Sequence, residues 1–486
     1  MKKVLTILSI ALLFSSISAQ NPDAEYNLIK HHYTLNSDST IDYNFRKEIK
    51  YLRNKAITAY ADKGETFILY NPAFETLTIN ECYTIRPDGT KVTTPQNAFI
   101  NQLPSECVNC GRFNGIREMA IVHTALEINS VVVLDYTIHR KSNILSETIQ
   151  PQQNCPVKKF EIIVDAPQND AIDIKYNEPL CAIKWTLAND MHTYHFVANN
   201  LPQTFNESYM PQPEKLYTQV SLKSTNQHSN KSTFPENLEG ANEVLNSLKK
   251  DNATDYVVAI RDYVIDNINT NNIPSSLLNY EVAPASVTWA SNCGTQQDKM
   301  LLLRSLLNQA GFSSYPAEEN ENTLIVSIDG RQQRLSATHK TPITLYGIAR
   351  EEDASLTVEK EMPLDTIRLV DGYFIVKIPM GHQIYNPSML TSERNSPLLT
   401  HKCAESYHYT IPLPKGAKMV GNKVDISKKF KGLGEVSVTI KQKGSTLDVK
   451  RNLTIEKDII STQDYKDFRE IMQIWGSYNQ VQVVSE

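Results

Sequence analysis

Residues 292–317 have the sequence NCGTQQDKMLLLRSLLNQAGFSSYPA, and this stretch decides the fold that we expect for the chain. Its apolar residues recur at the three- and four-residue spacing of one helix face. They are Met300, Leu302, Leu303, Leu306, Leu307 and Ala310. Gly311 then stands where a residue just past a helix end is commonly glycine. We therefore predict a buried helix from about Cys293 to Ala310.

A cysteine opens this predicted helix. The N-terminus of a helix presents unpaired N–H groups and the positive end of the helix dipole, and both favour a thiolate. Cys293 is therefore the candidate nucleophile of the chain. The plainer alternative is a buried, inert cysteine or a cysteine in a disulfide. Asp298, five residues further on, is expected on the exposed face of the helix.

The same stretch resembles the nucleophile helix of the bacterial transglutaminase-like superfamily, through its Cys-Gly-x-x-x-Asp-Lys beginning and its Ala-Gly-Phe end. Residues 125–136, ALEINSVVVLDY, resemble the strand–turn–strand signature of the domain-of-unknown-function 3857 family, which is N-terminal in secreted members of one branch. The tail from Tyr465 to Trp475 is similar to that branch as well. The resemblance implies a papain-like domain in which a histidine and an aspartate assist the cysteine.

Those two assisting residues are absent from the positions that the resemblance gives them. The histidine position falls at Asn322, or at Thr323 beside it, and the aspartate position falls at Ser336. An asparagine cannot take a proton from a thiol, and a serine cannot stabilise an imidazolium as a carboxylate does. His339 is the remaining candidate base, although a histidine at the end of a strand usually faces solvent.

The composition indicates a globular chain that is exported. Of its 486 residues, 41% are hydrophobic and 21% charged, which excludes a disordered or fibrous chain. Lys2 and Lys3, an apolar run and a small-residue cleavage context predict a signal peptide over residues 1–19. Removal of this peptide takes away Lys2 and Lys3, so the net charge falls from -5 to -7. A chain with that negative charge is not expected to bind nucleic acid through electrostatic attraction. No later apolar run is long enough to span a membrane.

The periodicity of the sequence predicts an α+β multidomain chain. Period-two strand patterns dominate before residue 200 and after residue 405, and helical patterns lie between them. The expected segments are the signal peptide (1–19), an N-terminal β-sandwich domain (20–200), a linker (201–235), a central papain-like, transglutaminase-like domain (236–345), an irregular connecting segment (346–404) and a C-terminal β-sandwich-like domain with a terminal helix (405–486).

The seven cysteines suggest disulfides in an exported chain, and their odd number leaves at least one thiol unpaired or intermolecular. Cys107 and Cys110 form a lone Cys-x-x-Cys between Pro104 and Gly111, so we expect a loop with a local disulfide. A zinc site would need further cysteines or histidines nearby, and thioredoxin chemistry would need a strand before the motif and a helix after it. We expect no metal and no cofactor.

The leading hypothesis is a degenerate, non-catalytic transglutaminase-like protein that binds a protein, a peptide or a cell-envelope component. It would work in the periplasm or at the surface of a Gram-negative bacterium. One alternative is an active thiol enzyme, an amide hydrolase or acyltransferase, with Cys293 as nucleophile and His339 as base. Another is a structural accessory protein of an envelope complex. The distance from the Cys293 sulfur to the nearest histidine ring nitrogen distinguishes the first two hypotheses.

Overall fold

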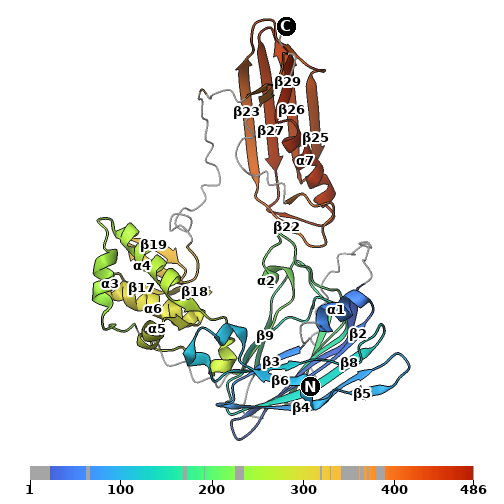
Figure 1. Ribbon diagram of the computed structural model, residues 1–486, viewed down its shortest axis with the longest axis vertical. Coiled ribbons are helices and arrows are strands. Elements are labelled where there is room, and N and C mark those ends of the chain that lie inside the picture. The colour runs from blue at the N-terminus through green and yellow to red at the C-terminus, as the bar shows by residue number, and fades with distance from the viewer. Residues whose placement is uncertain are drawn as a thin grey trace.

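The chain folds into three parts, an N-terminal part (22–224), a middle part (235–340) and a C-terminal part (366–484), as the computed structural model shows (Figure 1). The structure describes residues 22–61, 66–167, 172–190, 192–224, 235–317, 320–328, 330–340, 361, 366–368, 372–378 and 389–484. The expected signal peptide lies outside these residues. In the view of Figure 1, the C-terminal part stands above the N-terminal part, and the middle part lies to one side.

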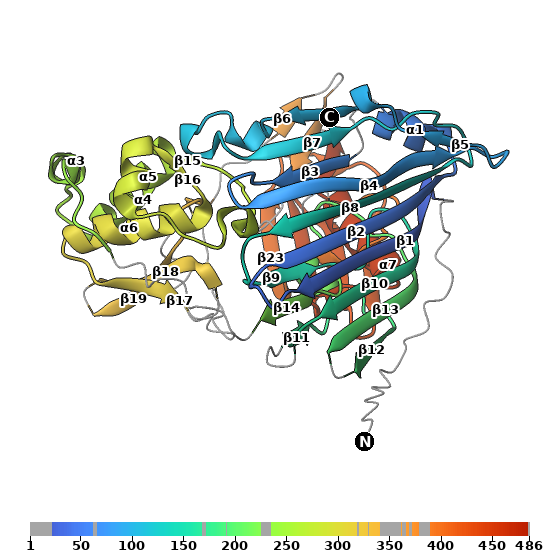
Figure 2. The ribbon, with the colours of Figure 1, turned by 90° about the horizontal axis from the view of Figure 1, so that it is seen from below.

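One sheet of eight strands forms the base of the N-terminal part, in the order β12-β13-β10-β1-β2-β8-β4-β5 (Figure 2). Its strands are β1 (Ala24–Leu35), β2 (Ile41–Tyr51), β4 (Glu75–Ile85), β5 (Lys91–Thr93), β8 (Val131–Arg140), β10 (Val157–Asp165), β12 (Trp185–Asp190) and β13 (Thr193–Leu201). All neighbours pair antiparallel except β1 and β10, which are parallel. A short helix, α1 (Asn54–Ala61), follows β2.

Two three-stranded sheets pack against the large sheet. One has the order β11-β14-β9 and the other β3-β7-β6. Their strands are β3 (Thr66–Tyr70), β6 (Phe99–Gln102), β7 (Arg117–Ile121), β9 (Ser146–Ile149), β11 (Ile172–Tyr176) and β14 (Val220–Ser224). Val220 and Leu222 of β14 join the same buried cluster as Phe160 of the large sheet. Residues 201–235, expected to be a linker, thus contribute a core strand, together with helix α2 (Pro213–Leu216).

Four helices and a three-stranded sheet make up the middle part. The helices are α3 (Ala241–Leu248), α4 (Ala253–Asn267), α5 (Ala285–Ser291) and α6 (Gln296–Gln309), and the sheet has the order β17 (Ser314–Ala317), β18 (Asn320–Ile328), β19 (Arg331–Leu335). A two-residue parallel pair, β15 (Asn269–Thr270) and β16 (Cys293–Gly294), lies beside them. The predicted leucine-rich face of α6 is buried against α4 and β18, and Gly311 takes the left-handed conformation expected after a helix.

In its described residues, the C-terminal part contains two four-stranded sheets, the two-stranded pair β22–β28 and one helix. One sheet has the order β23-β27-β26-β25 and the other β20-β21-β29-β24. The elements are β20 (Thr366–Arg368), β21 (Tyr373–Lys377), β22 (Leu398–Leu399), β23 (Cys403–Pro412), β24 (Lys418–Met419), β25 (Val424–Phe430), β26 (Gly434–Lys443), β27 (Thr446–Ile455), β28 (Ile459–Ile460), α7 (Tyr465–Ser477) and β29 (Gln480–Val484). Phe468 and Trp475 fix the predicted terminal helix in the core. The segment 346–404, expected to be irregular, supplies β20, β21 and β22.

Within the part of the chain that the structure describes, every helix is too short or too polar to cross a bilayer.

Candidate functional site

The predicted nucleophile lies just before helix α6, and the helix begins later than expected. Thr295 is the N-cap: its hydroxyl accepts from the Asp298 N–H at 3.2 Å, and the Asp298 carboxylate accepts from the Thr295 N–H at 2.8 Å. This capping box sets the first helical residue at Gln296. The prediction that the helix opens at Cys293 was therefore wrong, because Cys293 pairs with Asn269 in the short parallel bridge.

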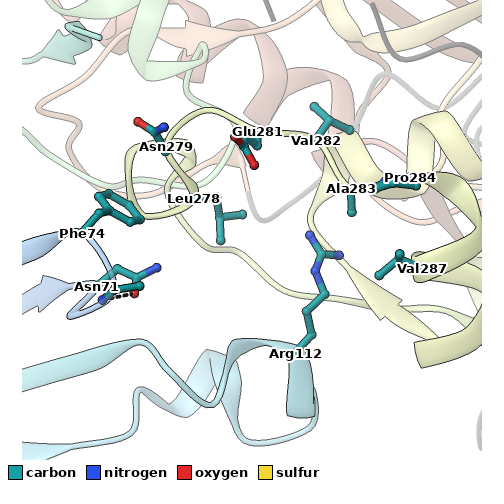
Figure 3. A pocket seen from close by; sticks show the side chains of 11 residues that line it. Asn71, Phe74, Arg112, Leu278, Asn279, Glu281, Val282, Ala283, Pro284 and Val287 are labelled. Atoms are coloured by element: carbon teal, nitrogen blue, oxygen red, sulfur yellow. Dashed lines mark hydrogen bonds between the residues drawn. The ribbon is translucent and has the colours of Figure 1, made fainter. Parts of the chain in front are cut away.

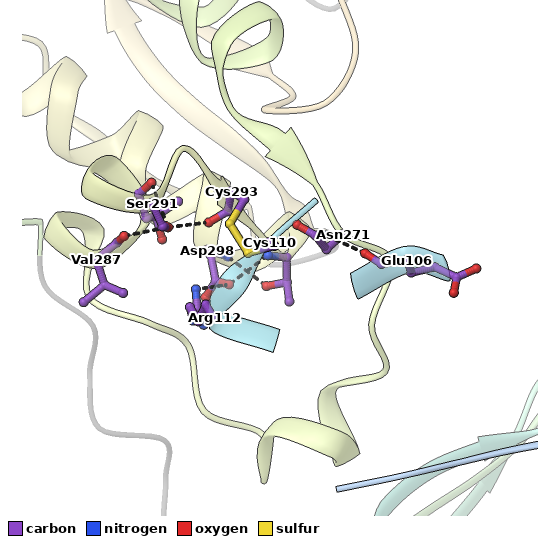
Figure 4. The surroundings of a disulfide bond; sticks show 10 residues. Glu106, Cys110, Arg112, Asn271, Val287, Ser291, Cys293 and Asp298 are labelled. Atoms are coloured by element: carbon purple, nitrogen blue, oxygen red, sulfur yellow. Dashed lines mark hydrogen bonds and ion pairs between the residues drawn. A yellow bond between two sulfur atoms is a disulfide. The ribbon is translucent and has the colours of Figure 1, made fainter. Parts of the chain in front are cut away.

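The sulfur of Cys293 is bonded to the sulfur of Cys110, which comes from the N-terminal part (Figure 4). The two Cα atoms lie 5.9 Å apart, the chain between them spans 183 positions, and Cys293 is 1% exposed. The expected local disulfide between Cys107 and Cys110 was wrong. The loop between β6 and β7 reaches the middle part, so Cys110 meets Cys293 there (Figure 2).

Asp298 is fully buried at this junction, and the expectation of an exposed carboxylate was wrong. Besides Thr295, its carboxylate accepts from the Ala283 N–H at 2.7 Å and from Nη1 of Arg112 at 3.1 Å. A buried carboxylate is retained only where such donors replace water. Arg112 belongs to the same loop as Cys110, so an ion pair and a disulfide join the loop to the start of α6 (Figure 4).

The candidate base, His339, contacts residues next to it in the chain. His339 is exposed beyond the end of β19, where its Nδ1 lies 2.8 Å from Oγ1 of Thr338 and 3.5 Å from Oγ of Ser336. Asn322 lies on β18, and its side chain is outside the described residues. Among the residues that the structure describes, no histidine forms a hydrogen bond with the Cys293 sulfur.

A cysteine and a histidine do meet in the N-terminal part, which the sequence did not predict. The Cys82 sulfur lies 3.7 Å from Nδ1 of His123, and the His123 Nε2 lies 3.1 Å from the Thr66 hydroxyl. Burial, together with the nearby charge of Lys47, lowers the pKa of His123 to about 3. The imidazole is therefore neutral and a weak base at neutral pH, which does not suit general-base catalysis.

A buried cation, Lys299, lies on α6 one residue after Asp298. The Lys299 ammonium donates to the Ile268 carbonyl at 2.6 Å and to the Thr270 hydroxyl at 3.0 Å, and the residue is 1% exposed. Burial lowers the pKa of Lys299 to about 8. Because these partners belong to β15 and the turn before it, Lys299 holds the strand that pairs with Cys293.

A cleft of about 490 Å³ opens between the N-terminal and middle parts, and Arg112 on its wall lies two residues after Cys110 in the chain (Figure 3). Its lining residues are Asn71, Ala73, Phe74, Arg112, Leu278, Asn279, Glu281, Val282, Ala283, Pro284 and Val287. The Arg112 guanidinium points into it, and Val287 is 41% exposed. The size lies in the range of small-molecule and peptide sites, and its walls combine apolar side chains with a few polar groups.

Hydrogen bonds hold the two walls of the cleft together. Asn71 donates its side-chain amide to the Leu277 carbonyl at 2.8 Å, and Asn271 donates to the Glu106 carbonyl at 2.5 Å. The Tyr280 hydroxyl donates to the Ser146 carbonyl at 3.0 Å and lies 3.1 Å from a carboxylate oxygen of Glu147. The cleft therefore lies next to an interface at which hydrogen bonds hold the N-terminal and middle parts together.

Two regions of the chain match family models of domains of unknown function. Residues 37–205 match DUF3857, as the sequence predicts, and residues 366–485 match DUF3858. No curated protein matches the chain. The chain is therefore a multidomain α+β protein that carries a DUF3857 and a DUF3858 region around a middle part that neither model covers.

A solved structure shares this whole fold. It is a protein from Parabacteroides distasonis ATCC 8503 that is provisionally described as a protease. Its chain is 24% identical to this one, the match covers 95% of this chain and 99% of that chain, and the TM-score is 0.68. At that identity the likeness establishes the common fold, and any shared activity is a separate question.

Proposed function

We propose that this protein is a non-catalytic member of the transglutaminase-like proteins that binds a protein, peptide or cell-envelope component outside the cytoplasm. The observation that carries the proposal is the bond between Cys293 and Cys110. A sulfur in a disulfide has no lone thiolate with which to attack an amide. Cys293, which lies just before helix α6, thus links the middle part covalently to the N-terminal part.

The surroundings of Cys293 favour the same conclusion. The candidate base, His339, is exposed and bonded to neighbouring hydroxyls, and the aspartate position is occupied by Ser336. The carboxylate nearest in sequence, Asp298, is engaged by the helix cap and by Arg112. Of the described groups named here, none is placed to accept a proton from the Cys293 thiol.

The cleft beside the disulfide supports a binding role. Phe74 and Leu278 give it apolar surface, and the Arg112 guanidinium and the Glu281 carboxylate give it groups of both charges. A peptide offers matching apolar side chains, charged groups and backbone amides. A disulfide between distant positions also persists best in an oxidising compartment, in agreement with the export that the first nineteen residues predict.

The catalytic alternative is tested by activity before and after reduction. The mature chain is incubated with a fluorescent casein and with a glutamine peptide plus a labelled amine, in oxidised form and after reduction of its disulfide. We expect no hydrolysis and no amine incorporation above those of the Cys293→Ser variant in either state. Turnover in the reduced protein that Cys293→Ser abolishes would overturn the proposal in favour of a thiol enzyme.

The binding role is tested by filling the cleft. A library of immobilised synthetic peptides is probed with the wild-type chain, with Val287→Arg and with Val420→Arg. Val287 lines the cleft, whereas Val420 belongs to the C-terminal part and is equally exposed, at 41%. We expect peptides that bind wild type and Val420→Arg and lose binding to Val287→Arg. Peptide binding that ignores Val287→Arg excludes the cleft, and absence of binding throughout supports a purely structural role.

A further inference from the structure

Three cysteines meet at the joint between the N-terminal and middle parts. Cys107, Cys110 and Cys293 belong to one buried cluster with Phe113, Ile116, Ile273 and Leu277. Cys110 and Cys293 form the disulfide, whereas Cys107 keeps a thiol. None of the three is more than 1% exposed. A thiol packed in the same apolar cluster as a disulfide needs no second molecule in order to react with it.

The backbone places Cys110 within reach of both other cysteines. The N–H of Cys110 donates to the carbonyl of Cys107 at 3.1 Å, which closes a four-residue turn. The ends of such a turn have Cα atoms less than about 7 Å apart. Disulfides join Cα atoms at roughly 4.4–6.8 Å, a range that also contains the 5.9 Å between Cys110 and Cys293. The central cysteine therefore has two geometrically possible partners.

We propose that these three cysteines form an internal thiol–disulfide exchange site. The Cys107 thiolate attacks the Cys110 sulfur, the Cys107–Cys110 bond forms, the Cys110–Cys293 bond breaks, and Cys293 leaves as a thiolate. The proton that Cys107 releases to solvent is replaced by one that Cys293 takes up. One disulfide is present before and after the step, so no external oxidant or reductant takes part.

The surroundings of Cys107 slow the exchange at neutral pH. Burial raises the pKa of the Cys107 thiol, and the charges of Glu106 and Glu118 raise it further. Since only the thiolate attacks a disulfide, the thiol waits in its protonated form at neutral pH. Burial at the same time shields the disulfide from outside thiols, so the internal cysteine is the favoured attacker.

The exchange moves the covalent bond from the joint into a single loop. With Cys107 bonded to Cys110, the middle part is held to the loop only by contacts such as Arg112 with Asp298 and Asn271 with Glu106. The start of α6 and the cleft wall next to it are then no longer linked covalently to the N-terminal part. The exchange requires neither a ligand nor an activity. It bears on the proposed function, because it releases the Cys293 thiol, and the comparison with Cys293→Ser in the activity assays shows whether that thiol catalyses a reaction.

The exchange is tested by mapping disulfides in the oxidised full-length mature chain without reductant. The protein is held at pH 8.5, trapped with iodoacetamide and digested. We expect a growing fraction in which Cys293 carries the alkyl group and the peptide that contains Cys107 and Cys110 is lighter by two hydrogen atoms. The rate should rise about tenfold per pH unit below the pKa of the attacking thiol.

Two kinds of variant isolate the attacking thiol. Cys107→Ser and Cys107→Ala are expected to leave Cys293 bonded to Cys110 and unmodified, whereas Cys403→Ser, which removes a thiol far from the joint, exchanges like wild type. In Cys293→Ser, Cys107 and Cys110 are expected to pair with each other. Three outcomes would each overturn the proposal: a form with Cys107 alkylated and the Cys110–Cys293 bond intact whose share does not fall with time, a Cys107–Cys293 product, or equal behaviour of wild type and Cys107→Ser.

Discussion

Asp298 joins three structural roles in one carboxylate. It completes the capping box of α6, it accepts the Ala283 N–H, and it neutralises Arg112 from the other part of the chain. A buried charge costs free energy unless its donors replace the lost water, and here each oxygen has such donors. The residue type is therefore fixed by the joint as much as by the helix.

Replacing Asp298 by Asn is expected to destabilise the protein by about 3 kcal/mol, because it leaves the Arg112 guanidinium without its buried carboxylate. The free energy of unfolding in urea measures this loss. Asp266→Asn is the matched control: Asp266 pairs with Lys340 at the surface, where the side chains are 54% and 48% exposed. Its loss should stay within about 1 kcal/mol. Equal losses would contradict a special role of Asp298.

Lys299 makes the stability depend on pH. Its pKa in the folded chain is about 8, because burial disfavours the ammonium, whereas an unfolded lysine titrates near about 10.4. Between these values the unfolded chain binds more protons, so the free energy of unfolding rises with pH, and below pH 8 this slope vanishes.

The rise in the free energy of unfolding that Lys299 causes between pH 8 and about 10.4 is at most about 3 kcal/mol, because its pKa in the folded chain is about 8. The measurement is the difference in unfolding free energy between wild type and Lys299→Met at pH 7, 8, 9 and 10. That difference should move in favour of wild type as the pH rises. Lys299→Arg, whose charge persists, should show no such slope. A pH-independent difference for Lys299→Met would refute the assignment.

The beginning of α6 depends on a glycine. A Cβ at Gly294 would lie 2.8 Å from Cβ of Asp298 and 3.1 Å from Cγ2 of Thr288. The hydrogen bonds to the Asp298 carboxylate hold its side chain in place, so the backbone around Gly294 would have to shift. Gly294→Ala should cost about 1–3 kcal/mol of stability. Gly115→Ala, where nothing lies within 4 Å of the new Cβ, is the control and should be near neutral in urea unfolding. A harmless Gly294→Ala would show that the close approach is relieved at no cost.

Elements with a regular local pattern were predictable, and those set by distant contacts were not. Strand patterns that are regular in the sequence before residue 200 become strands of the structure, for example β3 (Thr66–Tyr70) and β8 (Val131–Arg140). Strand β1, with His31 and His32 side by side, lacks a clean alternation, and its place inside the sheet is set by its neighbours β10 and β2. Local sequence also placed Cys293 beside a buried helix. It could not show that Cys110, 183 positions away, would arrive there, because that contact depends on how two parts dock.

The disulfide couples two parts that each have a hydrophobic core of their own. Cross-linking positions so far apart removes about 5 kcal/mol of loop entropy from the unfolded chain in the simplest model. The benefit belongs to the middle part in particular, since the N-terminal sheet is held by its own ladder of strands. Without the bond, the opened middle part regains the conformational freedom that the cross-link removes, so its opening costs less free energy.

Hydrogen exchange on the double variant Cys110→Ser, Cys293→Ser measures this coupling. We expect amides of α6 to exchange faster than in the oxidised wild type, while amides of β8 keep their protection, because local opening becomes less costly than global unfolding. Cys403→Ser supplies the control, with both elements unchanged. Equal loss of protection in α6 and β8 would mean that the chain unfolds as one unit, and no loss in either would mean that the noncovalent joint, including Tyr280 on Glu147, suffices by itself.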